Sequence, residues 1–333
     1  MASRKKSVAR VGDMLEREHP DTGVRARVRI GDCRTELEKF DEAREGSVDL
    51  VFADPPFNWA RAYDRWDDKM PEDEYLTFTY DWLDLCVRAL RPGGALWVNI
   101  PDDWAAEITA YLKGRLFVGG AGRRPPAEME MENWCVWHYR FGQNVTERFI
   151  NSKVHALYFV KAGGERTWNP TEVLEVSDRR AIYGDPRTES KRDGMPAGLR
   201  VPMDVWYGKF WGRIQGNNKE RRAQHDNQLP EVYLERVVRA CSNPGDLVLD
   251  PFTGSGTTGV VAHALGRNFI GTEFSPENAA RAFERIGLGP VRELGQGPQS
   301  TAIFENRRTT RATTKGEPEA KPARRRSGAS ASV

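Results

Sequence analysis

The chain lacks the features of a secreted, membrane-bound or metal-binding protein. Its 333 residues include four cysteines that lie far apart and form no CxxC pair, namely Cys33, Cys86, Cys135 and Cys241. Neither a zinc site nor a disulfide framework is therefore indicated, and we interpret the cysteines as reduced packing residues. No run approaches the roughly 18 consecutive apolar residues of a membrane span, and no apolar stretch follows the basic residues at the start. We expect a cytoplasmic protein that binds neither a metal nor a membrane.

A strong charge of either sign is missing too. The chain has 50 Lys and Arg residues and 48 Asp and Glu residues, and a formal net charge of +2 does not by itself indicate a polyanionic partner. Residues 307–326 differ, because they are rich in Arg, Lys, Thr, Pro and Ala and have almost nothing to bury. We expect a flexible N-terminus over residues 1–25 and a disordered basic tail over residues 291–333. The tail either adds attraction to phosphates or has no role.

The chain does contain a regular alternation of strand and helix patterns. With 39% apolar residues it can bury one large core. Strand patterns occur at residues 26–30, 48–53, 95–100, 247–250 and 268–273, and helical patterns at 35–45, 72–90, 230–240, 257–265 and from Ser275 onward. This order predicts an α/β fold with a mostly parallel sheet. Two more strand patterns, at 134–139 and 154–160, are expected to form an antiparallel edge.

The strongest local motif is VLDPFTGSGTTG at residues 248–259, where an apolar strand ends in Asp250 and the next turn is rich in glycine. Glycines at the carboxyl edge of a parallel sheet let the backbone approach a nucleotide closely. No Lys follows them as in a P-loop and the spacing is not GxGxxG, which disfavours a nucleoside triphosphate or a dinucleotide. Glu273 ends the next strand pattern, 23 positions after Asp250, where a carboxylate could bind ribose hydroxyls. Together these features predict a site for an adenosine-containing cofactor.

A second motif, Asp54-Pro55-Pro56-Phe57, directly follows the strand pattern at residues 48–53. It could simply end a strand. Its chemistry also suits the exocyclic amine of adenine or cytosine, whose lone pair is delocalised into the ring. The Asp54 carboxylate and the Pro55 carbonyl oxygen would each accept a hydrogen bond from the amino group and stabilise the positive charge that develops on nitrogen. Phe57 would stack on the base, which must first be flipped out of the duplex.

The order of the two motifs resembles that of the β-class DNA amino-methyltransferases. In that family a DPPY-type catalytic motif precedes an FxGxG-type cofactor motif, with the target-recognition region between them. Here DPPF at residues 54–57 precedes DPFTGSG at residues 250–256. The resemblance implies a circularly permuted, Rossmann-like methyltransferase domain over residues 26–290, with a recognition insertion within residues 113–216.

The resemblance also implies the site residues. Catalysis falls to Asp54, Pro55, Pro56 and Phe57. Binding of S-adenosylmethionine falls to Asp32, Cys33, Asp54, Gln228, Asp250, Phe252, Gly254, Ser255, Gly256, Thr257 and Glu273. The sequence departs from the family pattern at three positions, because Asp226 stands where a Pro is usual, Leu229 where a Lys is usual, and Phe57 where a Tyr is commoner.

Residues 113–216 interleave basic residues with aromatic ones, which suits phosphate contact and stacking near an extruded base. For any single residue, a solvated loop face or local packing is the simpler explanation. The aromatic residues are Trp134, Trp137, Tyr139, Trp168, Tyr183, Trp206, Tyr207 and Trp211. We expect the region as a whole to bind DNA.

The sequence therefore predicts an enzyme that methylates N6 of adenine in double-stranded DNA. Adenine is favoured because Asp54 occupies the position where family members that act on cytosine more often have Ser. The alternatives are N4 of cytosine, an RNA base, and a catalytically silent DNA-binding protein of the same fold. The family resemblance is compatible with a homodimer and with a cognate restriction endonuclease, although no residue pattern identifies either.

Overall fold

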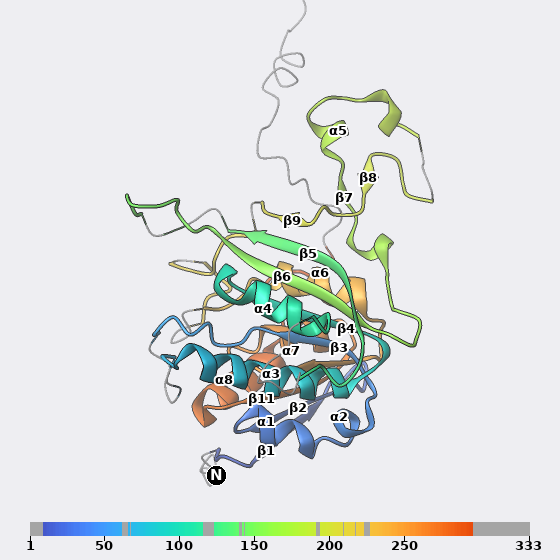
Figure 1. Cartoon of the computed structure of the whole chain (residues 1–333). Coiled ribbons are helices and arrows are strands. Elements are labelled where there is room, and N and C mark those ends of the chain that lie inside the picture. Colours follow the sequence, from blue (N-terminus) through green and yellow to red (C-terminus); the bar gives the residue numbers. More distant parts are fainter. Residues whose placement is uncertain are drawn as a thin grey trace, which may run out of the picture.

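The computed structural model describes residues 9–61, 66, 68–115, 123–139, 142, 144–190, 194–208, 210–216, 218–222 and 227–295. Its centre is a nine-stranded sheet with the strand order β1-β2-β11-β10-β3-β4-β6-β5-β9 (Figure 1). The strands are β1 (Met14–Glu18), β2 (Arg25–Ile30), β3 (Val48–Ala53), β4 (Leu90–Ile100), β5 (Met129–His138), β6 (Lys153–Lys161), β9 (Val205–Trp206), β10 (Leu247–Asp250) and β11 (Asn268–Glu273). Five neighbouring strands, β2, β11, β10, β3 and β4, are parallel, whereas β6 runs antiparallel to β4 and β5. The predicted α/β fold with an antiparallel edge is confirmed.

Helices cover both faces of this sheet. They are α1 (Cys33–Glu36), α2 (Asp41–Glu45), α3 (Glu72–Ala89), α4 (Asp102–Leu112), α5 (Asp178–Ala181), α6 (Glu231–Cys241), α7 (Thr257–Ala264) and α8 (Pro276–Leu288), with 3-10 turns η1 (Leu37–Lys39), η2 (Pro170–Val173) and η3 (Pro186–Thr188). One core joins the sheet to α6, α7 and α8, and the other joins it to α1, α2, α3 and α4. In the part of the chain that the structure describes, no helix is long and apolar enough to cross a membrane.

The N-terminal part of the chain differs from the expectation. Residues 14–18, expected to be flexible, form β1, which pairs antiparallel with β2 from Met14 opposite Arg29 to Glu18 opposite Arg25. This pairing satisfies the backbone groups that β2 would otherwise expose at the sheet edge. The helix expected at residues 35–45 is divided into α1, η1 and α2, because Phe40 adopts an extended backbone and buries its ring in the core.

The C-terminal end of the expected domain also needs correction. Residues 291–295, assigned to a disordered tail, are described, and the amides of Val291 and Arg292 donate hydrogen bonds to the Glu231 carboxylate. The remainder of that tail, residues 296–333, and residues 1–8 lie outside the described residues. Helix α4 had no counterpart in the sequence interpretation.

The region expected to be a recognition insertion is partly built into the main sheet. Its strands β5 and β6 continue the sheet beyond β4, and Trp137, Tyr139, Trp206 and Trp211 are buried in the core. A smaller part, with α5 and the two short strands β7 (Glu175–Val176) and β8 (Leu199–Arg200), projects away from the sheet (Figure 1). Trp137, Tyr139, Trp206 and Trp211 are therefore part of the hydrophobic core.

The strand order shows where a ligand site should lie. Strands β10 and β11 come late in the sequence but lie between β2 and β3 in the sheet, as a circular permutation requires. From β3 the chain moves outward to β4, and from β10 it moves the opposite way to β11. The boundary between β10 and β3 is therefore a topological switch point, and in such sheets ligands bind at the carboxyl ends of the strands beside it.

Candidate active site

A pocket opens at the carboxyl ends of β2, β11, β10 and β3. Twelve of the predicted site residues line it: Asp32, Cys33, Asp54, Pro55, Pro56, Phe57, Asp250, Phe252, Gly254, Ser255, Thr257 and Glu273. The fold thus brings the DPPF motif and the glycine-rich motif to one cavity, although most of the chain separates them in sequence. The sequence interpretation missed other lining residues, among them Trp66, Phe78 and Asn227.

Two predicted cofactor residues, Gln228 and Gly256, do not line this pocket. The Gln228 side chain is buried, its Nε2 donates to the Glu220 carbonyl oxygen at 2.6 Å, and its Oε1 accepts from the Arg222 amide at 3.0 Å. Its amide therefore holds residues 220–222. Gly256 has a φ of +80°, and a Cβ atom there would lie 3.1 Å from backbone atoms of Ala282. Glycine at this position lets α7 begin close to α8.

Carboxylate side chains accept hydrogen bonds from backbone amides of the glycine-rich turn and of Ser275, which follows Phe274 after the end of β11. Glu273 Oε2 accepts a hydrogen bond of 2.8 Å from the Gly254 amide, and its Oε1 accepts one of 3.0 Å from the Ser275 amide. Asp250 Oδ1 accepts from the Phe252 amide at 2.8 Å. The turn is therefore held in place by the two acidic residues that end β10 and β11.

The pocket lining suits a cationic ligand with a flat ring. Four carboxylate residues, Asp32, Asp54, Asp250 and Glu273, line it, and the described lining residues include no Lys or Arg. Aromatic rings form another part of the wall, with Phe78 and Phe252 in edge contact at 6.2 Å between centroids. S-adenosylmethionine fits this set of residues, since it carries a sulfonium, an ammonium and an adenine ring, whereas a polyphosphate would meet only negative side chains. No group of three or more His, Cys, Asp or Glu able to hold a metal occurs among the described residues.

Asp54 is held by a chain of two further buried side chains. Its Oδ1 accepts a hydrogen bond of 2.7 Å from Asn99 Nδ2, and Asn99 Oδ1 accepts one of 3.1 Å from the Tyr233 hydroxyl. No described residue donates a hydrogen bond to the other oxygen, Oδ2. Neither Asn99 nor Tyr233 was predicted, although Asn99 stands out as the polar residue in the apolar strand pattern 95–100. The arrangement leaves Oδ2 available to a substrate amino group.

Burial dominates the electrostatics of the two central carboxyls. It raises the pKa of Asp54 to about 7, against the hydrogen bond from Asn99, and the charge of Asp250 raises it further. Burial also raises the pKa of Asp250 to about 7, against hydrogen bonds from Thr258 and the Phe252 amide, and Glu273 adds to the rise. Two desolvated carboxyls with raised pKa values in one cavity are typical of a functional site.

The rest of the DPPF motif is fixed through its backbone. The Pro56 carbonyl oxygen accepts from the Tyr75 hydroxyl at 2.6 Å, and the Phe57 carbonyl oxygen accepts from Trp104 Nε1 at 2.9 Å. The Pro55 carbonyl oxygen, in contrast, receives no hydrogen bond from any described residue. Of the three carbonyl groups, the one expected to bind the amino group is the one that the protein leaves unoccupied.

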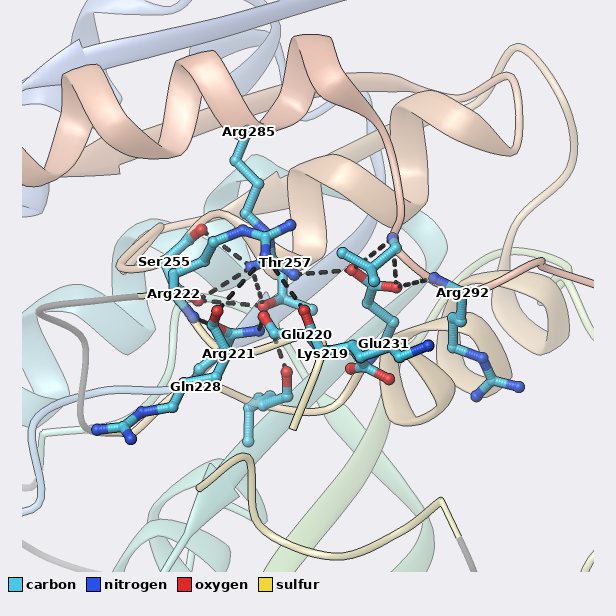
Figure 2. A network of polar contacts seen from close by, with 12 residues as sticks. Lys219, Glu220, Arg221, Arg222, Gln228, Glu231, Ser255, Thr257, Arg285 and Arg292 are labelled. Atoms are coloured by element: carbon cyan, nitrogen blue, oxygen red, sulfur yellow. Dashed lines mark hydrogen bonds and ion pairs between the residues drawn. The ribbon is translucent and has the colours of Figure 1, made fainter. Parts of the chain in front are cut away.

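A buried ion pair contacts the glycine-rich turn on the side of helices α6 and α8 (Figure 2). Arg285 Nη2 lies 2.9 Å from Glu231 Oε1, and both side chains are at most 3% exposed. Arg285 Nη1 also donates to Thr257 Oγ1 at 2.8 Å and to the Ser255 carbonyl oxygen at 3.1 Å. Glu220 caps α6, because its Oε2 accepts from the Glu231 amide at 2.8 Å. The network ties α6 and α8 to the cofactor motif.

Comparison with known sequences shows that this chain is similar to DNA methylases. The model of the N6/N4 methyltransferase family, described as DNA methylase, matches residues 48–284. The type II methyltransferase M.BamHI of Bacillus amyloliquefaciens is 34% identical over 254 residues, which are 73% of this chain and 53% of that protein. The DNA adenine methyltransferase YhdJ of Escherichia coli K12 is 31% identical over 263 residues, 78% of this chain and 81% of that protein. This chain therefore spans about half of M.BamHI and most of YhdJ.

Solved structures agree on the fold. The M1.HpyAVI–SAM complex superposes with a TM-score of 0.52 at 21% identity and covers 78% of this chain and 98% of its own. The cytosine-N4-specific PvuII DNA methyltransferase gives a TM-score of 0.51 at 17% identity and covers 83% and 95% of the two chains. At these identities the likeness concerns the arrangement of helices and strands.

Proposed function

Because the chain belongs to the DNA methylase family of N6 and N4 methyltransferases, we propose that it transfers a methyl group from S-adenosylmethionine to N6 of adenine in double-stranded DNA. The observation that carries the proposal is that Asp54 of the DPPF motif and Asp250 of the glycine-rich motif line the same pocket. A cofactor held at β10 and β11 then faces the groups that bind the acceptor.

The protein residues act on the acceptor nitrogen. S-adenosylmethionine supplies an electrophilic methyl group on its sulfonium. The two acceptors left unoccupied, Asp54 Oδ2 and the Pro55 carbonyl oxygen, bind the two hydrogens of the amino group and localise its lone pair on nitrogen. Asp54 Oδ2 is also placed to take the proton that the nitrogen releases after methyl transfer, since the pKa of this carboxyl is raised to about 7.

The choice of adenine rests on Asp54 as the first residue of the catalytic motif and on the likeness to YhdJ, whose name states adenine. N4 of cytosine is the alternative, because the same two acceptors would bind its amino group in the same way. A homodimer and a cognate restriction endonuclease remain predictions of the family resemblance.

The test of the proposal is transfer of label from tritiated S-adenosylmethionine to unmethylated DNA. The wild-type chain is expected to label DNA, and Asp54→Ala to lower the rate by roughly 100-fold or more while still binding DNA, because a transition-state acceptor is lost. Asp73→Ala removes an exposed carboxylate of α3 and serves as the matched control. Equal rates for wild type and Asp54→Ala would overturn the proposal.

A further inference from the structure

Two arginines meet at one neutral oxygen beside the pocket. Arg61 Nη1 lies 3.0 Å, and Arg213 Nη2 3.2 Å, from Asn227 Oδ1. Asn227 is itself a lining residue of the pocket. The three residues come from distant parts of the chain, since Arg61 follows the DPPF motif, Arg213 lies at the end of the region expected to bind DNA, and Asn227 precedes α6. The fold therefore brings two positive charges together at a residue that lines the pocket.

Neither guanidinium group forms an ion pair with any residue that the structure describes. The nearby carboxylates are engaged elsewhere. Asp102 binds Lys153 Nζ at 2.8 Å, and Asp103 Oδ2 accepts from Trp59 Nε1 at 3.0 Å. Asp68 is buried and accepts hydrogen bonds from backbone amides, including those of Trp59 and Arg61. The positive charge of the two arginines is left without a neutralising partner there.

Three other arginines of the expected DNA-binding region have a carboxylate partner. Arg166, Arg187 and Arg200 each pair with a carboxylate of the same region, namely Glu132, Asp185 and Glu175. Their charges are therefore largely compensated within the protein. Arg148, Arg179 and Arg180 form no ion pair with a described residue either, so what distinguishes Arg213 is that it meets a second arginine, Arg61, at Asn227.

Aromatic rings hold the two guanidinium groups in position. The Arg213 guanidinium lies 5.3 Å from the centroid of the Tyr139 ring, and that of Arg61 lies 5.4 Å from the centroid of Trp59. Burial lowers the pKa of Arg213, Tyr139 opposes this effect, and the charge of Arg61 lowers the pKa further. Two half-buried cations that repel each other and are fixed by their neighbours form a preorganised site for an anion, because the anion relieves the repulsion.

We propose that Arg61 and Arg213 together clamp one phosphate of the DNA backbone, next to the nucleotide whose base enters the pocket. This inference rests on the proposed function, which makes DNA the substrate. Phe57, which would stack on that base, packs edge-on against Trp59 at 5.2 Å between centroids. The Arg61 guanidinium lies over the ring of the same Trp59. A flipped nucleotide needs its backbone held while its base leaves the stack, and guanidinium forks match the oxygen pairs of a phosphate.

The experiment compares equilibrium binding of unmethylated duplex DNA at several salt concentrations for the wild type, the double variant Arg61→Gln/Arg213→Gln and the control Arg44→Gln/Arg88→Gln. Arg44 and Arg88 are exposed residues of α2 and α3, and each pairs with a carboxylate outside the pocket, so the control removes the same charge elsewhere. The clamp predicts that the double variant weakens binding at least roughly tenfold and lowers the log–log salt slope by about 0.9, the value for one phosphate. The control should change neither quantity in the same way.

Three results would overturn the clamp: an unchanged slope, a slope lowered by about 1.8, which indicates two separate phosphates, or an equal effect in the control. The double variant Arg61→Lys/Arg213→Lys keeps both charges and loses the planar forks. It should restore the slope while leaving the affinity below that of the wild type. Label transfer by the wild type is measured in parallel, so a chain that binds DNA through the clamp but transfers no methyl group would refute the proposed function alone.

Discussion

Asn99 Nδ2 donates a hydrogen bond of 2.7 Å to Asp54 Oδ1, and this contact orients the carboxylate of the DPPF motif. The orientation of the amide is itself determined, because the Tyr233 hydroxyl donates to Asn99 Oδ1 and leaves the NH₂ group to face Asp54. Burial raises the pKa of Tyr233, so its hydroxyl stays protonated and remains a donor. Asn99 and Tyr233 are positioning residues for the acceptor-binding carboxylate.

The pH dependence of Asn99→Ala tests this positioning. Burial raises the pKa of Asp54 to about 7 and the hydrogen bond from Asn99 opposes the rise, so activity of the wild type should fall as the pH drops through about 7 and Asp54 becomes protonated. Without Asn99 the pKa should rise further, and the acid limb of the profile should move to higher pH. The measurement is kcat/KM between about pH 5 and pH 9, which reports groups of the free enzyme.

Tyr233→Phe provides the graded comparison for Asn99→Ala. It removes only the hydroxyl that fixes the amide, so a smaller shift of the acid limb in the same direction is expected. A lower maximum rate with an unmoved acid limb in both variants would show that these residues merely pack the fold.

Asp54→Asn should stabilise the protein while it abolishes activity. A carboxyl whose pKa is higher in the folded state binds its proton more tightly there, so its contribution to stability is best at low pH and is lost as the pH rises from about 4 to about 7. Asparagine cannot ionise and avoids this penalty. We expect a Tm gain at pH about 8 of at least roughly 1–2 °C, the shift for 1 kcal/mol in a protein of this length.

The control for this prediction is the pH itself. At a pH of about 4 Asp54 is protonated in the folded wild type and about half protonated in the unfolded state. Little of the ionisation penalty then remains, and Asp54→Asn should melt near the wild-type temperature. A Tm gain of the same size at both pH values would contradict the ionisation argument.

Arg285→Met should destabilise the fold strongly. It leaves the buried carboxylate of Glu231 without its ion-pair partner and removes the donors to the turn that carries Ser255 and Thr257. Breaking one side of a buried pair costs about 3–5 kcal/mol, so chemical denaturation should show a loss of that order. Arg281→Met, an exposed residue of the same helix, should stay within about 0.5 kcal/mol of the wild type.

A double variant at Arg285 and Glu231 separates the cost of the buried charge from the cost of lost packing. Arg285→Met combined with Glu231→Leu should recover part of the lost stability, because no uncompensated charge stays buried. If the double variant is less stable than Arg285→Met alone, the hydrogen bonds that Glu231 accepts from Val291 and Arg292 outweigh the charge effect.

Phe57→Ala should lower kcat/KM for DNA by roughly 10-fold or more, because stacking on one base contributes about 1–3 kcal/mol. Phe57→Tyr keeps the stacking face and should remain within a few-fold of the wild type. The comparison is made at saturating cofactor. An alanine variant as active as the tyrosine variant would exclude a stacking role for this ring.

The sequence predicted most of the sheet, because apolar strand patterns such as 268–273 and helix signals such as Ser275 are local. The helix expected from Ser275 onward is confirmed, and the Ser275 side chain caps it by accepting a hydrogen bond from the Asn278 amide. Pairing between distant segments leaves a weaker local signal, and β1, with no fully buried side chain, was therefore missed.

The site followed the same pattern. Twelve of the predicted site residues line one pocket, because their spacing reflects backbone geometry at strand ends. Gln228 does not line the pocket, because its amide binds the Glu220 carbonyl oxygen, a contact that the sequence does not indicate. Asn99, Tyr233 and the meeting of Arg61 with Arg213 depend on tertiary packing and became visible only in the fold.

The most direct test of the account is mass spectrometry of nucleosides from unmethylated duplex DNA after incubation with the purified chain and labelled S-adenosylmethionine. We expect labelled N6-methyladenine with the wild type and a background level with Asp54→Ala. Labelled N4-methylcytosine would contradict the assignment of adenine. No labelled nucleoside, from protein that binds both cofactor and DNA, would contradict the proposed activity itself.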